Sequence, residues 1–509
     1  MNLIKSTSTF SFFTFISRIL GYIRDFLIAI TLGSGPLSDA FFVAFRIPNT
    51  FRRLFSEGTF NAAFVPSYSS ELKKSKNKAN TFANQIFNIL LLGLLAVVIL
   101  IEIFMPLFIK AIAPGFSVNS DKFDLAIILT RITFPFLFFI SLASFFSAIL
   151  NSHNKFGVAA AAPIILNIIL IIILLLDLGF GDQIVVQLSY GVSIAGFLQL
   201  FLLFIFVKKK FTPIISFKLN IDNKVKFFFK KLLPSIFSSG VTQINILIGT
   251  IIASFEVNAV SYLYYADRIY QINLAIAGIA IGTVLLPNLS KHLTTKNIGK
   301  INLIQDKSIE LSFFLSLPAM LALVVASEQI TSSLFGYGSF DKISVINSSK
   351  ALYYFAFGLP AFALIKILSA FLFARQNTKI PFYFSLVSVI INILISVVYF
   401  NKIGFIIIPI ATTISSWINV VLLYFYLSSR KYFVFNQNLI FSILKISCSS
   451  FLAIYSFYLI LNNFSELFAY ESSLKFIFMI TSVLIVGIIY LFISLLTKAF
   501  KLTDIKLKY

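Results

Sequence analysis

The sequence has 509 residues, of which 59% are hydrophobic and only 12% are charged, and its mean hydropathy is +0.95. Soluble globular proteins are about half apolar and about a quarter charged, so this composition excludes an ordinary soluble domain and predicts an all-α polytopic membrane protein. The net charge of +22 would suit a nucleic-acid-binding protein, but most lysines fall in connections between apolar segments, so nucleic acid is not an expected partner.

Apolar segments that are long enough to cross a bilayer as helices follow one another along the chain. We predict about fourteen transmembrane spans, at 8–32, 37–68, 83–109, 123–150, 157–178, 184–207, 228–255, 259–290, 308–335, 349–374, 380–401, 404–429, 438–462 and 473–497. The first span contains Arg18, Arg24 and Asp25, which do not suit the apolar core of a cleavable signal peptide, so we expect it to be retained.

The connections between the spans alternate in charge. One set is rich in lysine, as at 73–78, 208–231 and 291–300, whereas intervening connections such as GSGPLS and FEVN carry almost no positive charge. The positive-inside rule then predicts that both termini lie in the cytoplasm.

Two parts of the sequence resemble each other at an offset of about 222 residues. AFRI at 44–47 matches ADRI at 266–269, and SAILNSHNKFG matches SAFLFARQNTKIP. Because each copy holds an even number of spans, both enter the membrane in the same direction, which predicts two six-helix lobes related by pseudo-two-fold symmetry about the membrane normal. The predicted domains are an N-terminal lobe at 1–207, a cytoplasmic linker at 208–225, a C-terminal lobe at 226–430, and a final helix pair with a cytoplasmic tail at 431–509.

Few residues are available for metal binding or catalysis. Cys448 is the single cysteine, which excludes an intramolecular disulfide, and the two histidines, His153 and His292, lie in separate connections without a metal-like spacing. We therefore expect no metal and no catalytic residues.

Arginine and lysine are distributed differently, because most arginines lie within or at the edge of predicted spans. A charge at the centre of a membrane helix costs about 2.5–3.5 kcal/mol, so a cluster of charges requires a wet cavity or internal partners. Guanidinium groups bind phosphate oxygens bidentately, and a cavity lined by several of them would suit a phosphorylated polyanion. The predicted substrate-binding residues are Arg18, Arg24, Asp25, Asp39, Arg46, Arg52, Arg53, Glu57 and Arg268.

The same charges allow a second interpretation, in which they form ion pairs that hold helices together. The pairs would be Arg18 with Asp25, Asp39 with Arg46, and Arg53 with Glu57. Arg131 and Lys366 fit either role. Asn167 and Asn392, at matching places in the two copies, are expected to form hydrogen bonds between helices.

At these residues the chain resembles the MurJ (MviN) family, the lipid II flippases of the multidrug/oligosaccharidyl-lipid/polysaccharide exporter superfamily. The resemblance spans nearly the whole chain, and its most specific segments are SRILGYIRD, SDAFFVAFRIPNTFRRLFSEGTFNAAFVPSYS, APGF at 113–116, YYADRIY and GTVLLPNLSK. It implies a transporter rather than an enzyme, which moves an undecaprenyl-pyrophosphate-linked peptidoglycan precursor across the bacterial inner membrane by alternating access.

The resemblance also implies roles for particular residues. The family's essential cavity charges match Arg18, Arg24, Asp39, Arg52 and Arg268, and its last two helices form a groove for the lipid tail. Some members bind sodium through an acidic residue in the seventh span, but GVTQINILIGT at 240–250 has none, so no sodium site is expected.

The expected partners are lipid II, or a related polyprenyl-pyrophosphate-linked substrate, and membrane lipids. No cofactor is expected, and the membrane potential or a coupling ion would drive transport. The expected assembly is a monomer, with other cell-wall synthesis proteins as candidate associates.

Two other functions remain open from the residues alone. A cation-coupled multidrug exporter of the same superfamily should have a cavity rich in acidic residues rather than arginines. A membrane enzyme acting on polyprenyl phosphates should carry clustered carboxylates for a metal, or histidines for acid–base chemistry.

Overall fold

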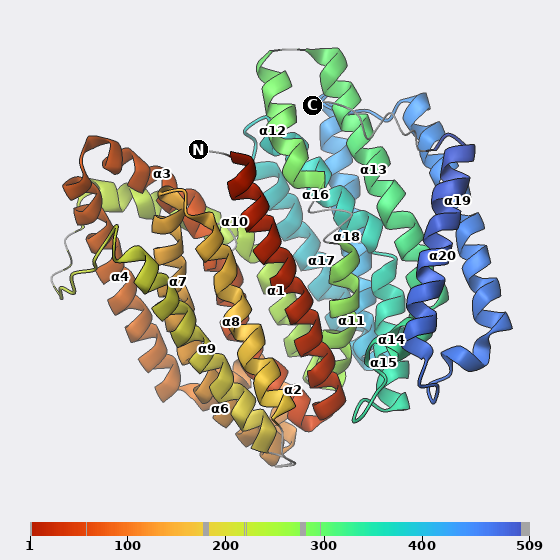
Figure 1. Ribbon diagram of the computed structural model, residues 1–509, viewed down its shortest axis with the longest axis horizontal. Coiled ribbons are helices and arrows are strands. Elements are labelled where there is room, and N and C mark those ends of the chain that lie inside the picture. Colours follow the sequence, from red (N-terminus) through yellow and green to blue (C-terminus); the bar gives the residue numbers. More distant parts are fainter. Residues whose placement is uncertain are drawn as a thin grey trace. The chain divides into compact units, whose positions relative to one another are not determined.

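The computed structural model describes residues 3–56, 59–176, 183–217, 219, 221–274, 281–295 and 297–499. Within these ranges the chain forms helices joined by short connections, and it contains no strand (Figure 1). The predicted all-α class is therefore confirmed. The chain divides into two compact units, Met1–Val260 and Ser261–Tyr509, which are called unit 1 and unit 2 below.

Unit 1 contains the helices of the first half of the sequence. They are α1 (Leu3–Leu32), α2 (Pro36–Ser56), α3 (Thr59–Lys74), α4 (Lys76–Ile103), α5 (Met105–Ile112), η1 (Pro114–Val118), α6 (Ser120–Thr133), α7 (Pro135–Ser152), α8 (Phe156–Leu175), α9 (Gln183–Val207) and α10 (Asn223–Ala253). In this unit α1 packs along α8, and α2 packs against α6 and α7.

Unit 2 contains the remaining helices, of which the first begins at the boundary. They are α11 (Ala259–Leu274), α12 (Ile281–Thr294), α13 (Ile298–Val325), α14 (Ser327–Phe335), α15 (Lys342–Ala356), α16 (Leu359–Phe373), α17 (Lys379–Ile403), η3 (Gly404–Ile406), α18 (Ile407–Ser429), α19 (Gln437–Asn463), η4 (Ser465–Phe468) and α20 (Lys475–Leu496). The last pair, α19 and α20, packs together, and α19 also packs against α13.

The helix bounds repeat along the chain at an offset of about 222 residues. Helix α4 starts at Lys76 and α13 starts at Ile298, and both are 28 residues long. In each copy the first, fifth and sixth predicted ranges hold one α-helix, whereas the second, third and fourth hold two consecutive α-helices. The predicted internal duplication is thus visible in the secondary structure, with α19 and α20 outside it.

Capping residues occupy matching positions in the two copies. Ser75 accepts a hydrogen bond from the Lys78 amide at the start of α4, and Asn297 does so from the Lys300 amide at the start of α13. Asn119 caps α6, and Asp341 caps α15 in the same way. Side-chain oxygens at this position satisfy backbone amides that have no partner inside the helix, so short polar residues fix where these helices begin.

Prolines account for two of the places where a predicted span is divided into two consecutive helices. Pro135 is the first residue of α7, directly after α6, and Pro360 lies in the first turn of α16. Proline lacks the amide that would continue the preceding helix, so the chain can bend there. Helices α15 and α16 meet at an angle of 42°.

By length and apolar composition, eight described helical segments can cross a membrane, or nine if the bent pair α15 and α16 is one span. One of these segments, Lys379–Ser429, holds both α17 and α18. The helices that carry the predicted arginine cluster, α1, α2 and α11, are not among them. The number of about fourteen spans stays a prediction.

An aromatic cluster fixes the start of α10 within unit 1. The ring of Phe228 on α10 lies 5.8 Å from Phe60, 6.1 Å from Phe64 and 6.2 Å from Phe82, measured between centroids. All four side chains are buried. Helix α10, which the duplication assigns to the second copy, therefore packs on α3 and α4 of the first.

Candidate functional site

The charged centre of α1 is a hydrogen-bonded network. Arg24 and Asp25 are only 6% and 3% exposed. The Arg24 Nε and Nη2 atoms donate to Asp25 Oδ1 at 3.0 and 2.6 Å, and Nη1 donates to Asn167 Oδ1 at 2.9 Å. Asn167 in turn donates to the Ser17 carbonyl oxygen at 2.9 Å. Each of the three guanidinium nitrogens thus donates a hydrogen bond, and the bond to Asn167 joins α1 to α8.

The same guanidinium faces α2. Its carbon lies 5.8 Å from the centroid of the Phe45 ring, which is a cation–π contact. The short connection between α1 and α2 therefore places the two charged helices next to each other at this level, as their sequence predicts.

A second buried ion pair joins α2 to α6. Asp39, in the first turn of α2, is fully buried, and its Oδ2 atom accepts a hydrogen bond from Lys122 Nζ at 2.6 Å. The Lys122 ammonium also lies 4.1 Å from the centroid of the Phe116 ring. A carboxylate in the first turn is favoured by the helix dipole, and the Phe116 ring forms a cation–π contact with the ammonium that binds this carboxylate.

The sequence pattern does not single out Lys122, because this residue lies just before the predicted span 123–150. One signal was available: Lys122 follows the capping residue Asn119 in a connection that is otherwise poor in lysine. A lone cation at such a helix start can meet an acid at the start of a neighbouring helix.

The other predicted residues of unit 1 are more accessible. Arg18 is exposed, whereas Arg46, Arg52 and Arg53 are half-buried. Arg52 Nε donates to Asn49 Oδ1, one turn earlier on α2, at 2.9 Å. Glu57 lies outside the described residues, so its predicted pairing with Arg53 is not observed.

In unit 2, Arg268 lies half-buried on α11. Its Nη2 atom donates to the Tyr264 hydroxyl at 2.9 Å, and its guanidinium carbon lies 4.6 Å from the centroid of the same ring. The neighbouring Asp267 accepts a hydrogen bond from Gln271. Tyrosine thus orients this guanidinium.

The ion-pair interpretation is correct for Asp25 and Asp39, which both form buried ion pairs, while the pairs predicted for Arg46 and Arg53 stay predictions. Asp25 bonds to its neighbour Arg24, whereas Arg18 is exposed. Asp39 bonds to Lys122. Arg131 and Lys366 are both exposed.

The two asparagines have the predicted interhelical role. Asn167 joins α8 to α1 through Arg24 and Ser17. Asn392 on α17 donates to the Thr412 hydroxyl on α18 at 3.1 Å. This prediction is confirmed in both copies.

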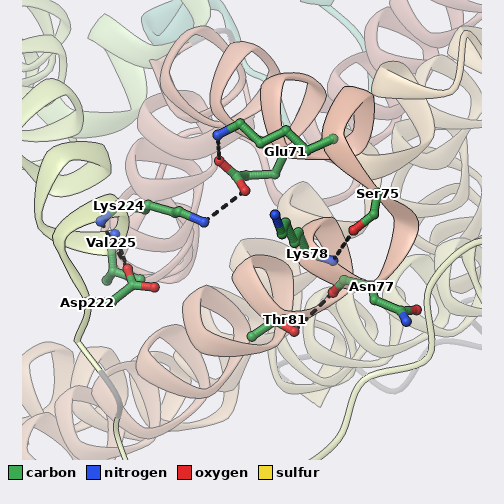
Figure 2. Close-up of polar contacts among 9 residues, drawn as sticks. Glu71, Ser75, Asn77, Lys78, Thr81, Asp222, Lys224 and Val225 are labelled. Carbon is green, nitrogen blue, oxygen red and sulfur yellow. Dashed lines mark hydrogen bonds and ion pairs between the residues drawn. The ribbon is translucent and has the colours of Figure 1, made fainter.

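Two polar contacts hold α10 at its ends. Near its start, Glu71 at the end of α3 accepts hydrogen bonds from Lys74 at 2.7 Å and Lys224 at 2.9 Å (Figure 2). These two ammonium groups hold the pKa of Glu71 below its usual value. Just after its end, the Ser254 hydroxyl accepts a hydrogen bond from the Gly115 amide in η1 at 3.0 Å.

The contact at Gly115 requires a residue without a side chain. A Cβ atom there would lie 2.2 Å from the Ser254 carbonyl oxygen and 2.5 Å from the Phe255 Cα atom. Both are backbone atoms, so the close approach of η1 to the end of α10 depends on glycine.

No three histidine, cysteine or acidic side chains converge on a common point among the described residues.

A comparison with protein families matches residues 28–496 to the model described as "Lipid II flippase MurJ". Among curated proteins, the "Probable lipid II flippase MurJ" of Rickettsia prowazekii (strain Madrid E) is 41% identical over 430 residues, which cover 84% of each chain.

Solved structures give the same result. One described as "Lipid II flippase MurJ, inward closed conformation" superposes with a TM-score of 0.82 at 30% identity, covering 95% of this chain and 97% of the other. An inward-facing multidrug resistance MATE family transporter of the MOP superfamily gives a TM-score of 0.66 at 16% identity, covering 81% and 94%. The second match shows a shared fold alone.

Proposed function

Because the chain belongs to the MurJ family of lipid II flippases, we propose that it carries lipid II from the cytoplasmic to the periplasmic leaflet of the inner membrane. The observation that carries this proposal is the match to a lipid II flippase structure over 95% of the chain at 30% identity. The chain is a multi-pass membrane protein and not an enzyme.

The chemistry of the substrate explains why guanidinium groups are needed. A pyrophosphate with attached sugars cannot cross hydrocarbon unaided, since burying an unpaired charge is prohibitively costly. Guanidinium groups can replace water around the phosphate oxygens through paired hydrogen bonds. The polyprenyl tail can stay in the bilayer, with α19 and α20 as the proposed groove.

We assign the predicted charges to two roles. Arg18, Arg46, Arg52 and Arg53 in unit 1 and Arg268 in unit 2 are exposed or half-buried, and they are the proposed ligands of the phosphate groups. Arg24, Asp25 and Asp39 are buried in ion pairs, and they are the proposed residues that hold the helices carrying those ligands.

Transport would proceed by alternating access, with the two lobes of the duplication opening in turn to each side. The sequence contains no G-x-x-x-x-G-K-[ST] loop, so ATP is not the proposed energy source. A net cationic cavity that moves in the membrane field would be driven by about 2.3 kcal/mol per charge per 100 mV. Both termini would lie in the cytoplasm.

Two alternatives have less support. A multidrug exporter shares the fold, but the match to such a transporter is at 16% identity, and the residues predicted to bind substrate in the first half of the chain include more arginines than acids. An enzyme acting on polyprenyl phosphates would need convergent metal ligands, which the described residues do not provide.

Mass spectrometry of lipids that copurify with the protein tests the substrate class. We expect lipids with a polyprenyl pyrophosphate and attached sugars. Copurification of organic cations, with no such lipid even after lipid II is supplied during purification, would contradict the proposal.

A further inference from the structure

The connection between α9 and α10 runs as an extended chain along the start of α4. The Ile214 amide donates to Asn84 Oδ1 at 2.8 Å, and the Ser216 amide donates to Asn88 Oδ1 at 3.0 Å. Asn88 Nδ2 also donates to the Ile214 carbonyl oxygen at 3.0 Å. Two asparagines one turn apart on α4 therefore hold this backbone in place.

The side chains of this connection do not pack into unit 1. Ile214, Ile215 and Phe217 are 66%, 65% and 82% exposed. Leu219 and Ile221 are also exposed. Because an ordered and hydrogen-bonded backbone presents them, these apolar side chains need another apolar environment to lie in.

The position of the connection along α4 suggests what that environment is. Asn84 and Asn88 lie about 12 and 18 Å along the helix axis from Lys76. The part of α4 before them is polar, whereas the part from Ile89 to Ile101 has no charged residue. The asparagines thus mark the point where α4 enters the hydrocarbon, so the connection lies at the membrane surface.

Lysines flank the apolar side chains on both sides in the sequence. Those that are exposed are Lys208, Lys209, Lys210, Lys224, Lys226 and Lys230. Both nearby acids have local partners: Glu71 bonds to Lys74 and Lys224, and Asp222 accepts from the Lys224 and Val225 amides (Figure 2). The surface therefore carries a large excess of positive charge.

We propose that the described residues of the connection and of the start of α10, at 208–217, 219 and 221–230, form a membrane anchor that binds the anionic phospholipids of the leaflet it faces. The isoleucines and Phe217 insert among the acyl chains, and the flanking lysines contact the headgroup phosphates. Apolar insertion and lysine–phosphate attraction together give stronger surface binding than either does alone. This site is separate from the arginines proposed to bind lipid II, and it recognises the bulk lipid of the leaflet.

A fluorescent label on the anchor tests the proposal in the full-length protein. The exposed Cys448 is first replaced by C448S, and F217C is then labelled with an environment-sensitive dye. The protein is placed in nanodiscs of phosphatidylcholine, with or without phosphatidylglycerol. We expect the emission to shift to the blue when phosphatidylglycerol is present, and the shift to fall as salt is added.

Variants that lack lysine charges show whether the emission shift depends on contact between lysines and phosphates or only on burial of the dye in the bilayer. K208Q, K209Q and K210Q together should reduce the phosphatidylglycerol-dependent shift. The matched control is K342Q, K350Q and K402Q, which removes three exposed lysines from unit 2 and should leave the shift unchanged. Equal emission in both lipid mixtures, or a shift of the same size in the triple variant and in its control, would overturn the proposal.

Discussion

Arg24 and Asp25, consecutive residues of α1, form a buried ion pair in which one carboxylate oxygen accepts from Nε at 3.0 Å and from Nη2 at 2.6 Å. Neighbouring residues on a helix point in different directions, so this pairing depends on the length of the arginine side chain. The guanidinium also reaches Asn167 on α8. The most deeply buried arginine of the predicted cluster therefore joins two helices of unit 1.

Loss of Asp25 should destabilise the protein strongly. D25A leaves the Arg24 guanidinium buried without its carboxylate, and breaking a buried pair in this way costs about 3–5 kcal/mol. The free energy of unfolding can be measured by titration with a denaturing detergent, followed by circular dichroism. D121A, which removes an exposed acid from α6, is the control and should change the free energy of unfolding little. Equal stability of the two variants would show that the pair does not hold α1.

The pair between Asp39 and Lys122 should show strong coupling. K122A leaves a fully buried carboxylate without its ammonium, and D39A leaves the ammonium without its carboxylate. The double variant removes both charges. Its loss in the free energy of unfolding should therefore be smaller than the sum of the losses in the two single variants, by about 1.5 kcal/mol or more. Additive losses in the same unfolding experiment would mean that the two side chains do not depend on each other.

Gly115 should be intolerant of even the smallest side chain. G115A places a methyl group against the backbone of Ser254, so η1 must separate from the end of α10. In a C448S background, a cysteine introduced by S254C should react faster with a maleimide when G115A is present.

The control for that experiment is G93A, because a Cβ atom at Gly93 meets nothing within 4 Å. If G115A and G93A gave the same rate of labelling, the close approach of η1 to α10 would not depend on glycine.

Stability should depend on pH through Glu71. Its pKa is lowered by hydrogen bonds from Lys74 and then Lys224, so the folded protein holds the charged form more strongly than the unfolded chain does. This contribution is fully present above the ordinary glutamate pKa of 4.5 and is lost as the pH falls through the lower folded value. E71Q should therefore show a smaller loss of stability than the wild type between neutral pH and the range below 4.5. Because both lysines are half-exposed, salt should reduce the difference. Parallel pH profiles would contradict this role.

Much of the fold follows from local sequence patterns. Apolar length predicts where helices lie, and the weak repeat at AFRI and ADRI corresponds to helix bounds that repeat at the same offset. The interhelical asparagines at 167 and 392 are also predictable, because amides inside apolar helices need partners.

The partners of the charges are not predictable from spacing alone. Helical spacing favours Arg18 with Asp25, but the tertiary packing of α1 on α8 buries Arg24 instead. Lys122 meets Asp39 across 83 residues of sequence, because α2 and α6 pack side by side. Which acid each cation pairs with depends on which helices pack together, and the hydrophobic periodicity of a single sequence does not show helix packing.

The transport of lipid II by accessible arginines is tested most directly with purified protein in lipid vesicles that contain fluorescent lipid II. A reagent outside the vesicles reports how fast the labelled headgroups cross. The wild type and R430A, which removes an exposed arginine from the connection after α18, should both speed this crossing. R18A combined with R52A should reduce it to the rate of protein-free vesicles while the protein stays folded. Undiminished crossing by the R18A and R52A variant would contradict the account.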